Sequence, residues 1–270
     1  MSKQWDDRCA PLVSTVQSIG QGAVAVSGGV DSLTLAYVAH RVLGHQVTMY
    51  HATSAAVPPE ATARVQRYAA SEGWQLELVD AGEFDDPRYM ENPINRCYYC
   101  KTHLYDAIQT AATGIVMSGT NTDDLGDFRP GLTAASERRV RHPLVESDIS
   151  KADVRAIARA LSLEDLSELP AAPCLSSRIE TGIAIDPSTL RAVHRTERLI
   201  GERLSPRTVR CRVRSSGVVI ELDPESLAAL TAEAQKTLQE QIAAHFDPLT
   251  AVKFTTYAMG SAFVAPPGST

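Results

Sequence analysis

The chain has 270 residues, of which 44% are hydrophobic and 21% charged, so it can bury a core and is too apolar for a disordered chain. Its formal net charge of -6 argues against a protein that wraps nucleic acid by electrostatic attraction. No apolar run approaches the roughly 20 residues of a membrane helix, and the chain starts with polar residues. Its five cysteines, an odd number, do not suit a disulfide framework. The protein is therefore expected to work in the cytoplasm, without a membrane partner.

The first half of the chain alternates between strands and helices. Short apolar runs predict four buried strands, at 23–26, 47–51, 74–79 and 115–118. Apolar residues at helical spacing predict connecting helices, at 31–43, 59–71 and 101–112. This alternation is typical of an α/β fold with a parallel sheet and helices on both faces.

The rhythm changes in the second half. A capping box at Ser150–Asp153 opens a helix, and Asp186-Pro187 opens another. Further apolar patterns predict a hairpin of two strands at 209–213 and 218–222, a helical stretch over 227–246 and a last strand over 252–257. We therefore expect two domains that meet near residues 170–185, an α/β domain over 1–175 and a small α+β domain over 176–270.

The residues that follow the first strand have a composition suited to binding phosphate. Ser27, Gly28, Gly29, Asp31 and Ser32 lie between the strand and the next helix. The glycines allow a tight turn that brings backbone N–H groups to an anion, and the helix start adds partial positive charge. The serine hydroxyls can donate to phosphate oxygens, and the carboxylate can hold Mg²⁺. The simpler interpretation is a plain glycine turn between a strand and a helix.

Polar residues also follow the fourth strand. Asn121, Asp123, Asp124 and Asp127 are expected at its carboxyl end, where α/β sheets bind their ligands. Asn121 and Asp124 are candidates for binding nucleotide or Mg²⁺, with acidic loop capping as the alternative.

Two further segments carry cysteines. Cys97 and Cys100 form a C-x-x-C pair, and Cys174 lies far downstream. Such thiols serve zinc, iron–sulfur or dithiol sites, and His103 continues the spacing toward a Cys₃His zinc site. Cys9 and Cys211 lie outside any motif and are expected to have no role in the chemistry, and Cys211, on a predicted strand, is expected to pack.

The loop at 27–32 resembles the signature of the PP-loop ATP pyrophosphatases, which have an adenine nucleotide alpha hydrolase-like fold and make adenylates from ATP. Most of the chain resembles one branch, the LarE family of ATP-dependent sulfur transferases. The shared motifs occur in order, at 27–32, 92–101, 119–124, 129–131, 173–179 and 260–261, with Arg212, Arg214, Ile220 and Glu221 of the hairpin before the last of them.

The resemblance implies that ATP·Mg²⁺ binds at the loop and that an acceptor carboxylate, of a pyridinium mononucleotide in nickel-pincer cofactor synthesis, is adenylated. It implies that Cys97, Cys100 and Cys174 hold a [4Fe–4S] cluster whose open iron carries the sulfide that displaces AMP. In the family's other type, the cysteine matching Cys174 is alone and gives up its own sulfur. Catalytic roles are thus expected for these three cysteines and for Asp31.

The acceptor is expected to contact arginines and one glutamate. Arg129, Arg178, Arg212 and Arg214 are candidates for its phosphate and carboxylates, since guanidinium groups bind both in pairs of hydrogen bonds. Glu221 is a further candidate, with pairing to an arginine as the alternative. The sequence departs from the family's pattern at 180–181, at Val219 and at 262–263, in the part expected to contact the acceptor.

Other functions stay open at this point. An amide-forming PP-loop ligase would use ammonia in place of sulfide, a tRNA thiolase would also use three cysteines, and a regulator would bind ATP without cleaving it. The expected partners are a nucleotide substrate and sulfide or a sulfur donor, without nucleic acid. The resemblance implies a homo-oligomer, a trimer or a hexamer.

Overall fold

The computed structural model describes residues 7–126, 129–247 and 250–264, and the chain divides into two compact units. The first unit comprises Met1–Glu83 and Cys97–Ala172, and the second comprises Phe84–Arg96 and Pro173–Thr270. Within the described residues, no helix is long and apolar enough to cross a membrane.

The first unit is built on a parallel sheet. Its strands, as far as the chain is described, are β1 (Gly22–Ala25), β2 (Val47–Ala52), β3 (Gln75–Val79) and β4 (Ile115–Ser118), in the order β3-β2-β1-β4. Each expected strand is present, within one residue at either end, which confirms the α/β class.

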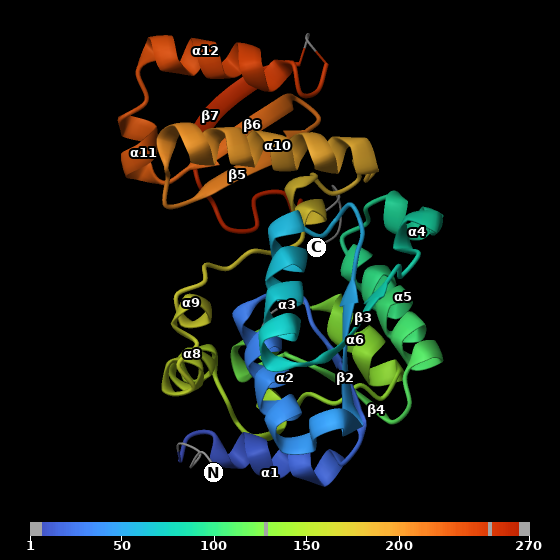
Figure 1. Cartoon of the computed structure of the whole chain (residues 1–270). Coiled ribbons are helices and arrows are strands. Elements are labelled where there is room, and N and C mark those ends of the chain that lie inside the picture. Colours follow the sequence, from blue (N-terminus) through green and yellow to red (C-terminus); the bar gives the residue numbers. More distant parts are fainter. Residues whose placement is uncertain (1–6, 127–128, 248–249, 265–270) are drawn as a thin grey trace. The chain divides into compact units, whose positions relative to one another are not determined.

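Helices cover both faces of this sheet (Figure 1). Those on one face are α1 (Ala10–Ile19), α2 (Val30–Leu43), α3 (Pro59–Glu72), α8 (Lys151–Ala160) and α9 (Glu164–Ser167). Those on the other are α5 (Arg96–Ala111) and α6 (Pro130–Glu137). A short helix, α7 (Pro143–Glu146), follows α6, and Leu144 packs with the first set.

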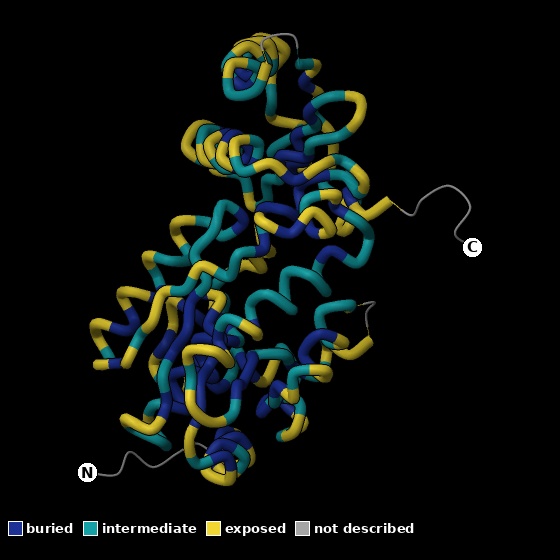
Figure 2. The backbone as a smooth tube through the Cα atoms, turned by 90° about the vertical axis from the view of Figure 1, so that its right-hand side faces the viewer, coloured by how far each residue is buried: buried dark blue, intermediate teal, exposed yellow. Residues whose placement is uncertain are grey.

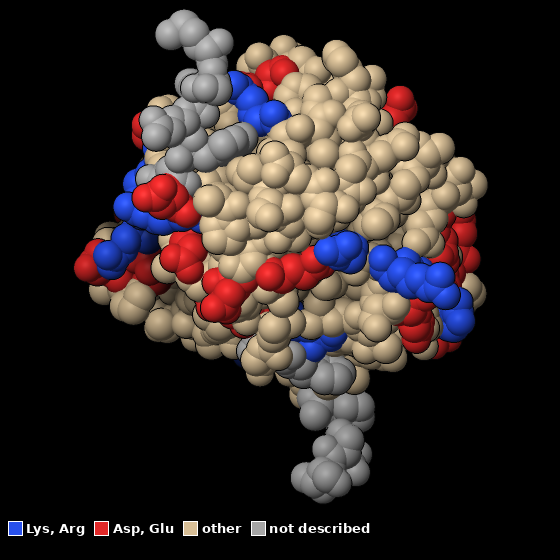
Figure 3. Space-filling view, turned by 90° about the horizontal axis from the view of Figure 1, so that it is seen from below, with Lys and Arg blue, Asp and Glu red and all other residues tan. Residues whose placement is uncertain are grey.

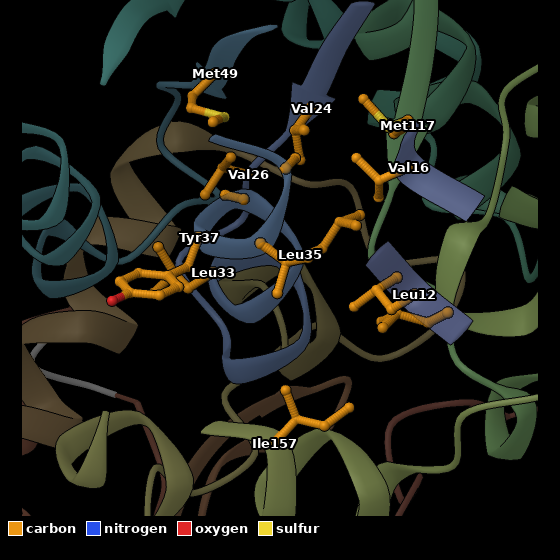
Figure 4. Close-up of a cluster of buried hydrophobic side chains, with 14 of the residues drawn as sticks. Leu12, Val16, Val24, Val26, Leu33, Leu35, Tyr37, Met49, Met117 and Ile157 are labelled. Carbon is orange, nitrogen blue, oxygen red and sulfur yellow. The ribbon is translucent and has the colours of Figure 1, made fainter. Parts of the chain in front are cut away.

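Alternation along the strands explains the two layers. Val24 packs with Met49 and Met117 against the helices of the first face (Figure 4), whereas Ala23 and Ala25 pack on the other. Since successive side chains of a strand point to opposite faces, a strand buried on both sides is apolar throughout. Figure 2 shows the resulting buried centre of this unit.

The second unit has a mixed sheet. Among the described residues its strands are β5 (Val209–Arg214), β6 (Gly217–Leu222) and β7 (Val252–Thr256), with β5 and β6 antiparallel and β6 and β7 parallel. The helix α10 (Pro187–Leu204) packs on β5, and α11 (Pro224–Ala228) and α12 (Ala232–Ala243) pack near β7. The hairpin and the last strand were predicted.

Two helical boundaries differ from the expectation. The stretch 227–246 is not one helix, because Asp223 and Thr231 each cap a separate helix by accepting a backbone N–H three residues on. The helix expected from 101 begins at Arg96, so the C-x-x-C pair lies in its first turns.

The segment Phe84–Arg96, which includes α4 (Pro87–Met90), belongs to the second unit, although the expected division at 175/176 placed it in the first. Long-range hydrogen bonds explain this. The Asn92 side chain donates to Glu180 O at 2.8 Å and to Ile183 O at 2.9 Å, and Ile185 N–H donates to Met90 O at 2.8 Å.

Charges are mixed on the face shown in Figure 3, where Lys and Arg side chains alternate with Asp and Glu around an uncharged area.

Candidate functional site

The loop between β1 and α2 has a backbone that only glycine adopts without strain. Gly28 has φ +83°, and a Cβ at this position would lie 2.8 Å from Ala61 O of α3. Gly29 is the N-cap of α2, and the first N–H groups of that helix have no acceptor within the helix. The loop thus presents backbone donors and the positive end of a helix dipole, as an anion site requires.

Side chains from α3 and β2 hold the loop from behind. The Arg64 guanidinium donates to Gly28 O at 2.7 Å, and burial lowers its pKa. The His51 ring lies 2.7 Å from Val26 O through Nδ1 and 2.9 Å from Thr62 Oγ1 through Nε2. Because a carbonyl can only accept, Nδ1 carries the proton, and burial lowers the pKa of His51, which keeps the ring neutral.

The two loop serines differ in exposure. Ser32 is buried, and its hydroxyl accepts from Ser27 N–H at 3.1 Å and donates to Gly29 O at 3.2 Å. It therefore shapes the loop from within. Ser27 is exposed, with its hydroxyl 3.1 Å from that of Ser32.

Asp31 lies in a polar network at the start of α2. Its carboxylate accepts from Asn121 Nδ2 at 3.1 Å and from Lys151 Nζ at 2.5 Å. Lys151 begins α8, and its backbone N–H donates to Asp123 Oδ2 at 3.1 Å. The sequence analysis predicted Asp31 and Asn121 for this site but missed the lysine, which brings a cation to the loop.

The residues after β4 lie against the same loop. A Cβ on Gly119 would be 2.7 Å from Ser32 N, so glycine is needed for this close approach. Asp124 accepts the Asn121 N–H at 3.1 Å, which is the loop capping given above as the alternative, and it also pairs with Arg129 at 2.8 Å. Asp127 lies outside the described residues.

The C-x-x-C pair lies one turn apart on α5. Cys97 and Cys100 are partly exposed, and Cys174, in the second unit, is exposed; within the described chain all cysteines are thiols. Each of these three thiols is therefore accessible enough to serve as a ligand. Across the residues that the structure describes, no group of three His, Cys, Asp or Glu side chains is arranged to hold a metal ion.

The predicted arginines of the second unit lie in ion pairs. Arg178 is buried and makes a bidentate pair with Glu197, at 2.9 and 3.1 Å. Arg212 is buried and pairs with Glu221 at 2.9 Å, and Arg214 reaches the same carboxylate at 3.3 Å. Glu221 thus pairs with arginines, the alternative interpretation given above.

Two other cysteines pack as expected. Cys9 and Cys211 are buried, and burial raises the pKa of the Cys211 thiol. Neither contributes an accessible thiolate.

The chain is similar to several known proteins over most of its length. An uncharacterised protein of Synechocystis is 41% identical over 213 residues, which cover 77% of this chain and 79% of that protein. The pyridinium-3,5-bisthiocarboxylic acid mononucleotide synthase of Lactiplantibacillus plantarum is 31% identical over 222 residues, covering 80% and 79%. An uncharacterised protein of Methanocaldococcus jannaschii is 24% identical over 228 residues, covering 80% and 83%. No family model matches the chain.

Proposed function

Because the chain belongs to the LarE family of sulfur transferases, we propose that it adenylates a carboxylate of a pyridinium mononucleotide with ATP and then replaces AMP by sulfur. The relative's name describes a product in which carboxyl groups on a pyridinium ring carry sulfur. A carboxylate oxygen is a poor leaving group, so the exchange requires activation before a sulfur nucleophile can displace it.

The loop is suited to the first step. A carboxylate oxygen of the acceptor attacks the α-phosphorus of ATP, the bond to the β-phosphate breaks, and pyrophosphate leaves with the electron pair. The first N–H groups of α2 and the ammonium of Lys151 would stabilise the negative charge on pyrophosphate. Asp31 would exchange its lysine partner for Mg²⁺, whose preferred ligands are oxygens.

The second step uses sulfur. A sulfide attacks the acyl carbon of the adenylate, and AMP leaves to give the thiocarboxylate. Cys97, Cys100 and Cys174 would hold a [4Fe–4S] cluster, which supplies an iron without a protein ligand where sulfide can be carried. A second candidate is direct sulfur donation by Cys174, favoured by its exposure to solvent.

The observation that carries the proposal is the Asp31–Asn121–Lys151 network beside a glycine loop at a helix start. The test is release of pyrophosphate from ATP in the presence of nicotinate mononucleotide, for the wild type, Lys151→Met and the exposed-lysine control Lys236→Met. We expect release by the wild type and the control and a loss of roughly 10²- to 10³-fold in Lys151→Met, as for removal of one preorganised donor.

The cysteines separate sulfur transfer from amide formation. With all three changed to serine, pyrophosphate release should persist while the thiocarboxylate product disappears from the mass spectrum. A wild type that releases no pyrophosphate, or that forms an amide from ammonium and ATP, contradicts the proposal.

A further inference from the structure

Arg96, the first residue of α5, is a buried cation without an anionic partner. Its side chain is 1% exposed, and among the described residues no carboxylate lies within ion-pair distance of it. Its Nη1 donates to Asn92 Oδ1 at 2.9 Å, whereas Nε and Nη2 are buried and have no hydrogen-bond partner there. A buried guanidinium with two unsatisfied nitrogens is costly, and such a group calls for an explanation.

The position of Arg96 in the helix adds to this cost. Cations are unfavourable at a helix N-terminus, because the helix dipole places partial positive charge there. An anion at this point would be attracted both by the guanidinium and by the helix start.

The two unsatisfied nitrogens are the pair that binds carboxylates elsewhere in this chain. Nε and Nη2 of Arg178 together bind one carboxylate, that of Glu197, at 2.9 and 3.1 Å. The same two nitrogens of Arg138 bind Asp106 at 2.6 and 3.0 Å, and those of Arg88 bind Asp86 at 3.0 and 2.9 Å. Arg96 presents this edge without a partner in the described part of the chain.

The aromatic contact of Arg96 does not use that edge. The Phe263 ring lies over the guanidinium at 4.4 Å, and a ring that stacks on the face does not use the in-plane N–H groups. Phe263 is 43% exposed and belongs to the coil after β7, so its displacement breaks no helix or strand.

We propose that Arg96 forms an oxyanion subsite of the second unit, which binds a carboxylate or phosphate group of the acceptor through Nε and Nη2. This rests on the proposed function only for the identity of the ligand. Asn92 acts as a positioning residue, since it fixes Nη1 and thereby the plane of the guanidinium. The sequence analysis did not single out either residue for binding.

The experiment measures ligand binding by calorimetry to the full chain, without ATP. The probes are nicotinate mononucleotide, which has a carboxylate and a phosphate, and nicotinamide mononucleotide, which has the phosphate alone. The variants are Arg96→Met and the control Arg88→Met, in the same segment and largely exposed. We expect Arg96→Met to lower the affinity for nicotinate mononucleotide roughly 10- to 100-fold, which is the effect of losing a charge-assisted bidentate pair. Arg88→Met should leave this affinity unchanged.

The two probes distinguish the bound group. Weakening confined to nicotinate mononucleotide assigns the subsite to the carboxylate, and equal weakening of both assigns it to the phosphate. Unchanged affinities in Arg96→Met, or no binding of either probe to the wild type, overturns the proposal. Pyrophosphate release is measured separately, so a failure of adenylation with intact Arg96-dependent binding would reject the proposed function alone.

Stability separates a binding role from a structural one. Without ligand, Arg96→Met should unfold at a temperature equal to or above that of the wild type, because an unpaired buried charge is removed. A lower unfolding temperature identifies Arg96 as structural and contradicts the subsite. If Arg96→Met does not fold, NMR spectroscopy of the wild type provides the test. The Arg96 Nε–H resonance is identified as the one that is lost in Arg96→Lys, and it must shift when nicotinate mononucleotide is added. Its failure to shift overturns the proposal.

Discussion

Replacing Gly28 with alanine tests whether the phosphate loop depends on close contact with α3. Positive φ at a residue with a side chain costs about 1–2 kcal/mol. The added Cβ would also lie 2.8 Å from Ala61 O, and overpacking of this kind costs about 1–3 kcal/mol. We therefore expect Gly28→Ala to lower the free energy of unfolding of the first unit by about 2–5 kcal/mol.

Two other glycines provide matched controls. Gly73 also has positive φ, +69°, but a Cβ there meets nothing within 4 Å, so Gly73→Ala should cost only the backbone strain of about 1–2 kcal/mol. A Cβ on Gly29 would meet only Ser27 Oγ at 3.6 Å without positive φ, so Gly29→Ala should change stability by less than about 0.5 kcal/mol.

The assay is urea unfolding followed by tryptophan fluorescence. Trp74 is buried in the first unit, so its signal reports on the unit that carries the loop. Pyrophosphate affinity is measured in parallel and should fall in Gly28→Ala but not in Gly73→Ala. Equal losses of stability in these two variants would refute the argument from Ala61.

Three further predictions concern a histidine, a helix cap and an ion pair. Burial lowers the pKa of His51 in the folded state, so the unfolded state binds more protons below the unfolded-state pKa of about 6.5. Stability should therefore fall as the pH drops from 6.5, and the fall should be smaller in His51→Gln, as measured in thermal melts across pH 5–7.5. Ser150→Ala removes the N-cap of α8 and should cost about 1 kcal/mol in urea unfolding, whereas Ser150→Thr should cost less. Arg178→Met should cost about 3–5 kcal/mol by leaving the Glu197 carboxylate buried and unpaired; normal stability with lost acceptor binding would instead identify Arg178 as a substrate contact.

The strands of the first unit were predictable because each is buried on both faces. The apolar run at 115–118 coincides with β4, and the capping box at Ser150 forms with Asp153 in the predicted role. The C-x-x-C pair was placed before its helix, since the polar and aromatic residues at 92–100 show no apolar periodicity. The helix begins there nonetheless, at Arg96.

The missed site residues depend on partners far away in the sequence. Lys151 reaches Asp31 across 120 positions, and Arg64 reaches Gly28 across 36. A local pattern shows the helix to which each belongs but not the atom that its side chain meets. His51 shows no ligand spacing in the sequence for the same reason, although its ring contacts the carbonyl just before the loop.

The hydrogen bonds that tie Asn92 and Met90 to residues 180–185 have a consequence for synthesis of the chain on the ribosome. The segment Phe84–Arg96 emerges about 90 residues before its partners, a delay of about 5–20 s at typical elongation rates. During that interval Tyr89 lacks Ser176, with which its hydroxyl forms a hydrogen bond in the finished protein. The second unit can therefore close only late in translation, and a gene fragment that begins at residue 176 would encode a protein without the segment that completes it.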